Sequence, residues 1–71
     1  MYVVIEVQAT DATHVATLVN SYEDRNAAES KWHDILKYAA ISSVPKHGAI
    51  IITDDCVPVL YKSYEHEVAN G

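Results

Sequence analysis

The apolar residues between Tyr22 and Ser43 recur with the period of an α-helix. Five of them fall at positions i, i+4, i+7, i+8 and i+11, namely Ala28, Trp32, Ile35, Leu36 and Ala39. Residues with this spacing share one face of a helix, and the charged residues between them fall on its other faces. The pattern therefore predicts one amphipathic helix whose apolar stripe, with Trp32 in it, packs on a sheet.

Both ends of the predicted helix carry residues that favour helix termini. Asp24 or Asn26 can cap the first turn, because their side-chain oxygens accept hydrogen bonds from backbone N–H groups without a helical partner. Asn26 followed by Glu29 also resembles a capping box. At the far end, Pro45 disfavours a helical conformation in the residue before it, so we expect the helix to end between residues 41 and 43.

Four other segments have strand-like patterns, rich in β-branched and aromatic residues. They are Tyr2 to Gln8, His14 to Ser21, Ala49 to Thr53 and Val57 to Glu65. Polar residues 9–13 connect the first two segments. Asp54 and Asp55 connect the last two, and we expect an Asp there to adopt the left-handed conformation of a tight turn. Residues 66–71 are predicted to be a frayed tail of a single small domain, residues 1–71.

The composition of the strands predicts their order in the sheet. The first and third strands contain continuous apolar runs, as central strands do. The second and fourth are more polar, and Pro58, which cannot donate to a ladder, favours an edge. We therefore predict an α+β fold with the element order ββαββ. Its four-stranded antiparallel sheet has the order 2-1-3-4, and the helix covers one face.

The alternation of side chains along each strand predicts which residues lie on the face away from the helix. If Ile50 and Ile52 pack under the helix, Ile51 points away from it. The same phasing predicts an interface patch made of Tyr2, Val4, Ile51, Leu60 and Tyr64. Because a contiguous apolar patch usually marks an interface, we expect a two-fold homodimer. Glu6 falls on the same face and counts against the dimer unless it reaches the rim or finds a partner.

Length, charge and cysteine content limit the function classes. A chain of 71 residues buries only ~60 % of its unfolded surface, and the single cysteine, Cys56, excludes an intramolecular disulfide. A net charge of −5 with five basic residues argues against nucleic acid or an anionic membrane as a partner. No apolar stretch approaches the ~20 residues that span a bilayer, so a cytoplasmic location is the default expectation.

The residue types that carry catalytic or ligand chemistry form no motif. The four histidines show no HExxH spacing, and His33 and His47 are the best candidates for a metal site. Cys56 lies beside two aspartates, which disfavour the thiolate that a nucleophile needs. The serines show no nucleophile elbow, and two glycines cannot form a phosphate-binding loop. We therefore expect no enzymatic activity and no cofactor.

Three stretches together, MYVVIEVQ, SYEDRNAAESKWHDIL and AAISSVPKHGAIIITDD, resemble a group of short uncharacterised proteins of gut Firmicutes and of their phages and mobile elements. The resemblance covers nearly the whole chain and implies one domain. It brings no catalytic residue, because no activity is assigned to that group. It implies that a small acidic protein of this kind acts by occupying the surface of a host protein.

Three hypotheses about function follow. The first is a non-enzymatic protein-interaction module that self-associates through the sheet face not covered by the helix. The second is a small acidic inhibitor that mimics nucleic acid or occupies a host protein surface, since ten acidic residues can present phosphate-like charge. The third is a domain that binds a small ligand or a metal through His33 and His47.

Overall fold

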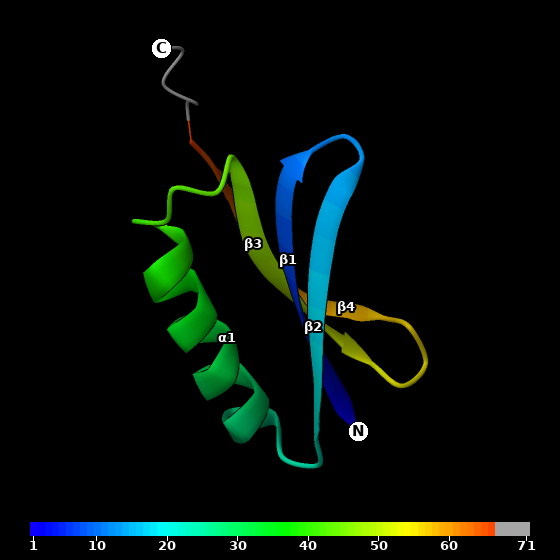
Figure 1. Cartoon of the computed structure of the whole chain (residues 1–71). Helices are drawn as coiled ribbons and strands as arrows, with labels where there is room; N and C mark the ends of the chain where they lie inside the picture. Colours follow the sequence, from blue (N-terminus) through cyan, green and yellow to red (C-terminus); the bar gives the residue numbers. More distant parts are fainter. Residues whose placement is uncertain (67–71) are drawn as a thin grey trace, which may run out of the picture.

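The protein has the ββαββ order that the sequence predicts. The computed structural model describes residues 1–66. Its elements are β1 (Tyr2–Asp11), β2 (His14–Tyr22), α1 (Arg25–Ala39), β3 (Lys46–Thr53) and β4 (Pro58–Glu65). The strands form one antiparallel sheet in the order β2-β1-β3-β4, and α1 lies on one face of it (Figure 1). The predicted α+β fold and strand order are confirmed.

The central strands are longer than their apolar runs. β1 continues three residues beyond Gln8, and β3 begins three residues before Ala49. The extra residues are paired: Gln8 lies opposite His47, and Ala9 lies opposite Lys46. The strands extend past the predicted ends because a ladder is held by backbone hydrogen bonds, which polar residues make as well as apolar ones.

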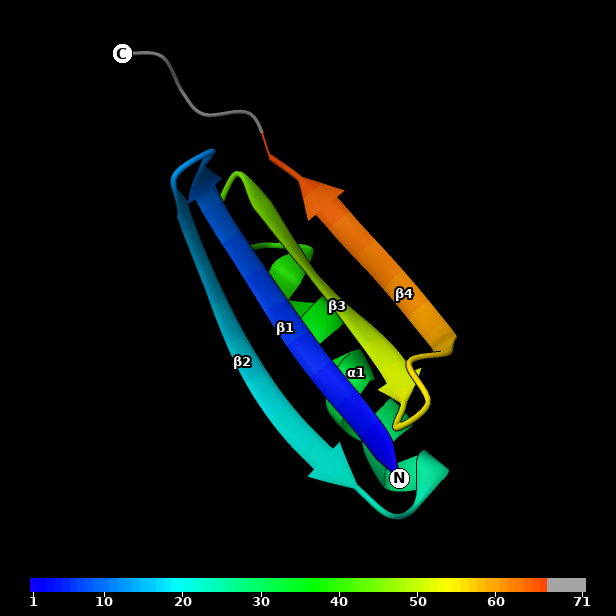
Figure 2. The same ribbon diagram turned by 90° about the vertical axis from the view of Figure 1, so that its right-hand side faces the viewer.

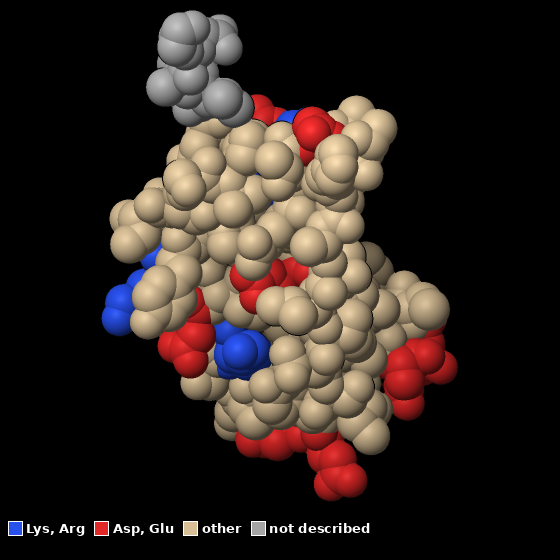
Figure 3. Space-filling view, in the orientation of Figure 1, with Lys and Arg blue, Asp and Glu red and all other residues tan. Residues whose placement is uncertain are grey.

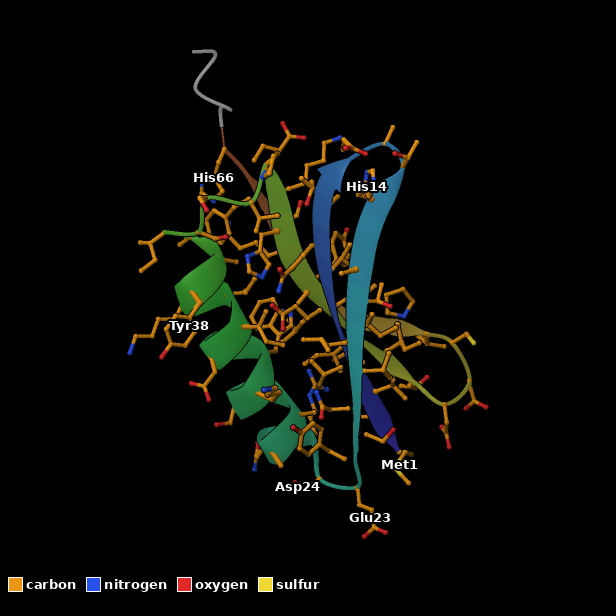
Figure 4. The ribbon with its side chains drawn as sticks, viewed as in Figure 1. Met1, His14, Glu23, Asp24, Tyr38 and His66 are labelled. Carbon is orange, nitrogen blue, oxygen red and sulfur yellow. The ribbon has the colours of Figure 1, made fainter. Side chains whose placement is uncertain are left out.

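The start of α1 confirms one of the two predicted caps. The Asp24 side chain accepts a hydrogen bond from the Asn26 N–H at 3.3 Å, and Asp24 is the N-cap (Figure 4). Asn26 lies inside the helix, so the capping box with Glu29 is wrong. Glu29 instead accepts a hydrogen bond from Nε of Arg25 at 2.9 Å, a pair one helical turn apart.

The end of α1 comes earlier than predicted. The helix ends at Ala39, and the N–H groups of Ile41 and Ser42 donate to carbonyls three residues back, which tightens the chain into a turn. His66, expected in the frayed tail, lies over this end of the helix (Figure 4). Its backbone N–H donates to the Pro45 carbonyl, and its Nε2 lies 2.7 Å from the Ala39 carbonyl oxygen. The rest of the predicted tail lies outside the described residues.

The turn between β3 and β4 takes its left-handed residue from Cys56 rather than from an aspartate. Cys56 has a φ of 64° and is exposed. Thr53 organises the turn, because its hydroxyl oxygen accepts hydrogen bonds from the N–H groups of Asp55 and Val57 at 3.3 and 3.2 Å. The Cys56 N–H donates to the Thr53 carbonyl. The left-handed residue of this turn is therefore its third, Cys56.

The core lies between the helix and the two central strands. The predicted helical stripe is confirmed, since Ala28, Trp32, Ile35, Leu36 and Ala39 are all buried. Val4, Ala49 and Ile51 face it from the sheet, and Val4 and Ile51 are 0 % exposed. The Trp32 indole N–H donates to the Ala49 carbonyl at 3.0 Å, so the one polar atom of this ring is satisfied inside the core.

The phasing of the sheet is opposite to the one predicted. Val4 and Ile51, expected on the face away from the helix, form the centre of the core beneath it. The other three predicted interface residues, Tyr2, Leu60 and Tyr64, pack against the same core. The apolar runs in β1 and β3 each place apolar side chains on both faces, so alternation alone does not tell which face the helix covers. The predicted interface set is therefore wrong.

We expect Trp32→Ala to lower the free energy of unfolding by ~3–5 kcal/mol, because it removes the largest side chain of the helical stripe from the core. Trp32→Phe keeps most of the apolar area but leaves the Ala49 carbonyl without its indole donor, and should cost about 1–3 kcal/mol. Chemical denaturation followed by circular dichroism measures both. Tyr38→Ala, at a residue 64 % exposed on α1, is the control. Equal midpoints for Trp32→Ala and the control would contradict this account of the core.

Candidate interaction surface

The face of the sheet away from α1 is apolar across all four strands. In one row, Val19 of β2 pairs with Ile5 of β1, Ile5 pairs with Ile50 of β3, and Ile50 pairs with Tyr61 of β4. Alternation puts the neighbours of this row two residues away on the same face. We define the open face by its apolar side chains: Val3, Ile5, Val7, Val15, Val19, Ile50, Ile52 and Tyr61. Figure 2 shows this side of the sheet with α1 behind it and no described element in front.

The open face is nearly free of charge. Among the paired strand positions that point to it, the charged residues are Lys46 and Glu65, which lie directly opposite each other at one end of β3 and β4. Acidic residues are instead found in connections, such as Glu23 and Asp24 before α1. Figure 3 shows acidic atoms at the β2–α1 connection below and at the β3–β4 turn on the right, and also near the middle of this view. The open face is thus apolar and electrically neutral within an acidic protein.

A hollow of about 370 Å³ lies in the open face beside Tyr61, and its lining is mostly apolar. Its lining includes Val7, Ala9, Lys46, Gly48, Ile50, Tyr61 and Ser63. Gly48 forms the floor because β4 comes too close for a side chain there. A Cβ on Gly48 would lie 2.5 Å from the Lys62 carbonyl oxygen and 2.7 Å from the Ser63 Cβ. The rim of this hollow includes Tyr61, a side chain 75 % exposed.

Under the helix, on the opposite side of the sheet, Glu6 and His47 form a buried pair. Nε2 of His47 lies 2.6 Å from Oε2 of Glu6, and the two side chains are 7 % and 14 % exposed. The Gln8 amide donates to the same carboxylate oxygen at 2.9 Å. Glu6 therefore does not lie on the open face, as the sequence pattern suggested, and its charge does not oppose packing there. Nδ1 of His47 has no hydrogen-bond partner among the described residues.

The surroundings of Glu6 favour its charged form. Burial raises the pKa of the Glu6 carboxyl, but hydrogen bonds from His47 and Gln8 and the positive charges of His47 and Lys31 lower it by more. The net effect is a pKa below the ordinary value of 4.5. Glu6 is thus a largely buried carboxylate whose charged form is stabilised by its partners.

The two histidines proposed as metal ligands have different neighbours. His33 is exposed on α1, and its ring meets the Trp32 ring edge-on, with centroids 5.0 Å apart. His47 is buried and bonded to Glu6. Within residues 1–66, no group of three or more His, Cys, Asp or Glu side chains is placed to hold a metal ion. The structure therefore offers no geometric support for a metal centre in the part of the chain that it describes.

Comparisons of the chain with protein-family models, with curated proteins and with solved structures find no match. The resemblance to proteins of gut Firmicutes and their mobile elements therefore stays a prediction. In the described part of the chain, no helix combines the length and apolar character needed to cross a membrane. The open face and the buried Glu6–His47 pair are the features from which a function can be argued.

The lowered pKa of Glu6 predicts a pH dependence of stability. The unfolded chain binds a proton at this residue at a higher pH than the folded protein does, so the stabilisation is present above about pH 4.5 and is lost as the pH falls through the lower folded pKa. We expect Glu6→Gln to flatten the decline of unfolding free energy between about pH 5 and 3. Denaturant titrations at several pH values measure this slope.

Glu23→Gln, at an exposed residue of the β2–α1 connection, is the matched control and should keep the wild-type slope. A residual slope is expected in Glu6→Gln as well, because hydrogen bonds from His14 and Thr13 lower the pKa of Asp11. Parallel profiles for wild type and Glu6→Gln would show that the Glu6–His47 contact does not hold the carboxylate in its charged form.

Proposed function

We propose that this protein is a non-enzymatic interaction module that self-associates through its open face. The observation that carries the proposal is the row Val19–Ile5–Ile50–Tyr61, which crosses the whole sheet and has no described element over it. Val19 and Tyr61, at the two ends of this row, are 59 % and 75 % exposed. Contiguous apolar surface of this kind is rare on monomers and marks protein interfaces.

The small size of the core supports the same proposal. Within the described residues, eight apolar residues are buried, and three of them are alanines. A chain of 71 residues gains limited stability from a core of this size. Packing a second apolar layer against the sheet removes further area from water at ~25 cal/mol per Å². Self-association therefore adds stabilisation that the single domain lacks.

A second copy fits the open face better than a charged partner does. The face is neutral at its centre, so it offers no ion pair to a basic or acidic surface. Its charged residues, Lys46 and Glu65, already oppose each other. Two copies related by a two-fold axis place identical apolar surfaces together, with the sheets ~10 Å apart, and the arrangement closes at two subunits.

Tyr61 and the hollow beside it are suited to anchor such a dimer. Tyr61 projects from the face, and the adjacent hollow has a floor of bare backbone at Gly48. In a two-fold arrangement, the ring of each copy can fill the hollow of the other. Aromatic side chains that enter a partner's pocket commonly dominate interface energies.

The acidic-inhibitor hypothesis has less support in the geometry. The carboxylates of Asp11 and Asp24 accept hydrogen bonds in the β1–β2 turn and at the start of α1, so they are used in local structure. The salt dependence of binding distinguishes the acidic-inhibitor hypothesis from self-association. The complex of a nucleic-acid mimic with a basic target weakens steeply with added salt, whereas apolar self-association does not.

Tyr61→Glu tests the self-association. We expect it to raise the dimer dissociation constant by at least ~30-fold, because a truncated interface anchor costs 2 kcal/mol or more. Sedimentation equilibrium over a concentration range measures the constant. Tyr38→Glu, the same substitution at an exposed tyrosine on α1, is the matched control and should leave it unchanged.

The predicted outcome requires the wild type to exceed its monomer mass of 7.9 kDa as concentration rises. A wild-type chain that stays monomeric at high micromolar concentration would overturn the proposal. Ile51→Glu is not a suitable test, because Ile51 is 0 % exposed in the core and the variant would unfold the domain. Circular dichroism of Tyr61→Glu verifies that the fold is retained.

A further inference from the structure

The two edges of the sheet differ in how they are protected. β2 is exposed at every position from His14 to Ser21, and its sequence HVATLVNSY contains no proline, glycine, acidic residue, lysine or arginine. An edge strand presents a row of backbone N–H and C=O groups that only water or another strand can satisfy. Long neutral edges without such interruptions are ready to pair with a further strand.

The other edge, β4, carries several features that block pairing. It begins with Pro58, which has no N–H to donate. Its ladder with β3 shifts register between Ile51 and Ile52, within the strand, whereas the shift in the β1–β2 ladder, between Ala9 and Asp11, lies at the hairpin end. Lys62 and Glu65 add charges to the strand. A charge, a proline and a bulge on an edge are the usual protections against unwanted pairing.

From this asymmetry we propose that the β2 edge pairs antiparallel with β2 of a second copy and joins two sheets into one continuous sheet. Because β4 is blocked, β2 of one molecule cannot extend into a fibre by pairing with β4 of the next. Pairing between the β2 strands of two copies is the edge contact that remains for identical chains. It is two-fold symmetric and closes at two subunits.

The side chains of β2 also support this pairing, in addition to its backbone groups. Leu18 points to the helix side and is 57 % exposed, because α1 lies behind β1 and β3 and leaves β2 beyond its border (Figure 2). Val15 and Val19 point to the open face and are 55 % and 59 % exposed. An added strand covers apolar side chains on both faces through cross-strand pairs.

Charge also fits a second copy as the occupant. Antiparallel pairing of identical strands brings the middle of each strand against its own counterpart. A charge in the middle of β2 would therefore meet itself across the axis, and β2 has none there. Asp11 lies opposite His14 at one end of β2, and Glu23 follows its other end. Glu6 of β1 lies opposite Leu18, on the helix side, where it is bonded to His47. The pairing thus brings together neutral segments of an acidic chain.

This edge pairing is independent of the face packing proposed above. The edge axis is perpendicular to the sheet, and the face axis lies in its plane. Where the two axes intersect, the two contacts together give a closed tetramer with dihedral symmetry. Each contact can therefore be removed by its own substitution, and the mass of the remaining assembly shows which contact was lost.

Leu18→Lys tests the edge, because two-fold pairing would bring two lysines together near the axis. Ser30→Lys, at an exposed position of α1, makes a similar change in charge and is the control.

With both contacts present, light scattering should give a tetramer for wild type and control, a dimer for Leu18→Lys or Tyr61→Glu alone, and a monomer for the double variant. If the face contact fails, wild type and Tyr61→Glu are dimers and Leu18→Lys is a monomer. A mass for Leu18→Lys equal to wild type overturns the edge pairing.

Amide hydrogen exchange of the wild type supplies a test that needs no variant. In a free edge strand, the N–H groups of alternate residues bond to β1, and those between them face water and exchange quickly. If β2 is paired on both sides, both sets of amides are protected, and protection of the outward set is lost on dilution. Fast exchange of alternate β2 amides at the highest protein concentration would overturn the proposal, whether or not Leu18→Lys folds.

Discussion

The packing of Trp32 on β3 is the contact on which the rest of the structure depends. Its ring lies in the core between α1 and the sheet, and its indole N–H bonds to the Ala49 carbonyl. Because side chains alternate along a strand, the position of Ala49 also fixes Ile51 and His47 on the helix side. Residues paired across the ladder lie on the same face, so the orientation of β3 also sets that of β1: Val4 lies opposite Ile51, and Gln8 lies opposite His47. One helix contact thus determines the orientation of every side chain in the central strands.

The same contact creates the surface that we propose as the interface. β1 and β3 are apolar on both sides, and residues 1–66 form one helix to cover them. Once α1 covers Val4 and Ile51, the residues between them in the strands, Val3, Ile5, Ile50 and Ile52, are left on the other face. A second apolar layer is needed on that face, and the described chain does not supply it. The open face is therefore a consequence of building a two-sided apolar sheet with one helix.

The sequence predicts the helical stripe and the strand order well, because both depend on local patterns: the spacing of Trp32 from its apolar neighbours, and Pro58 at an edge. It does not predict which face the helix covers. Val3-Val4-Ile5 and Ile50-Ile51-Ile52 are apolar at every position, so reversing the phase leaves the pattern unchanged. Small residues do not decide it either. Ala49 lies under Trp32, but Gly48 beside it is smaller and points the other way, where β4 fills the space. The deciding contacts join residues far apart in the chain, such as Glu6 and His47.

The position of Glu6 helps to explain why the helix covers the sheet face that carries Val4 and Ile51 and not the opposite face. In the opposite phase, Glu6 would lie on the uncovered face and keep its hydration, and Ile5 and Ile50 would be buried under the helix. For a monomer that arrangement avoids the desolvation of a carboxylate, but it leaves Val4, Ile51 and Leu60 on the uncovered face, so either phase exposes an apolar surface. The observed phase places the carboxylate under the helix, bonded to His47 and Gln8, and leaves an apolar face in contact with water. A second copy could cover the apolar face in either phase, but in the opposite phase the carboxylate of Glu6 would lie inside that interface, where its desolvation is a penalty. The burial of Glu6 is therefore what we expect of a chain whose open face is buried by assembly.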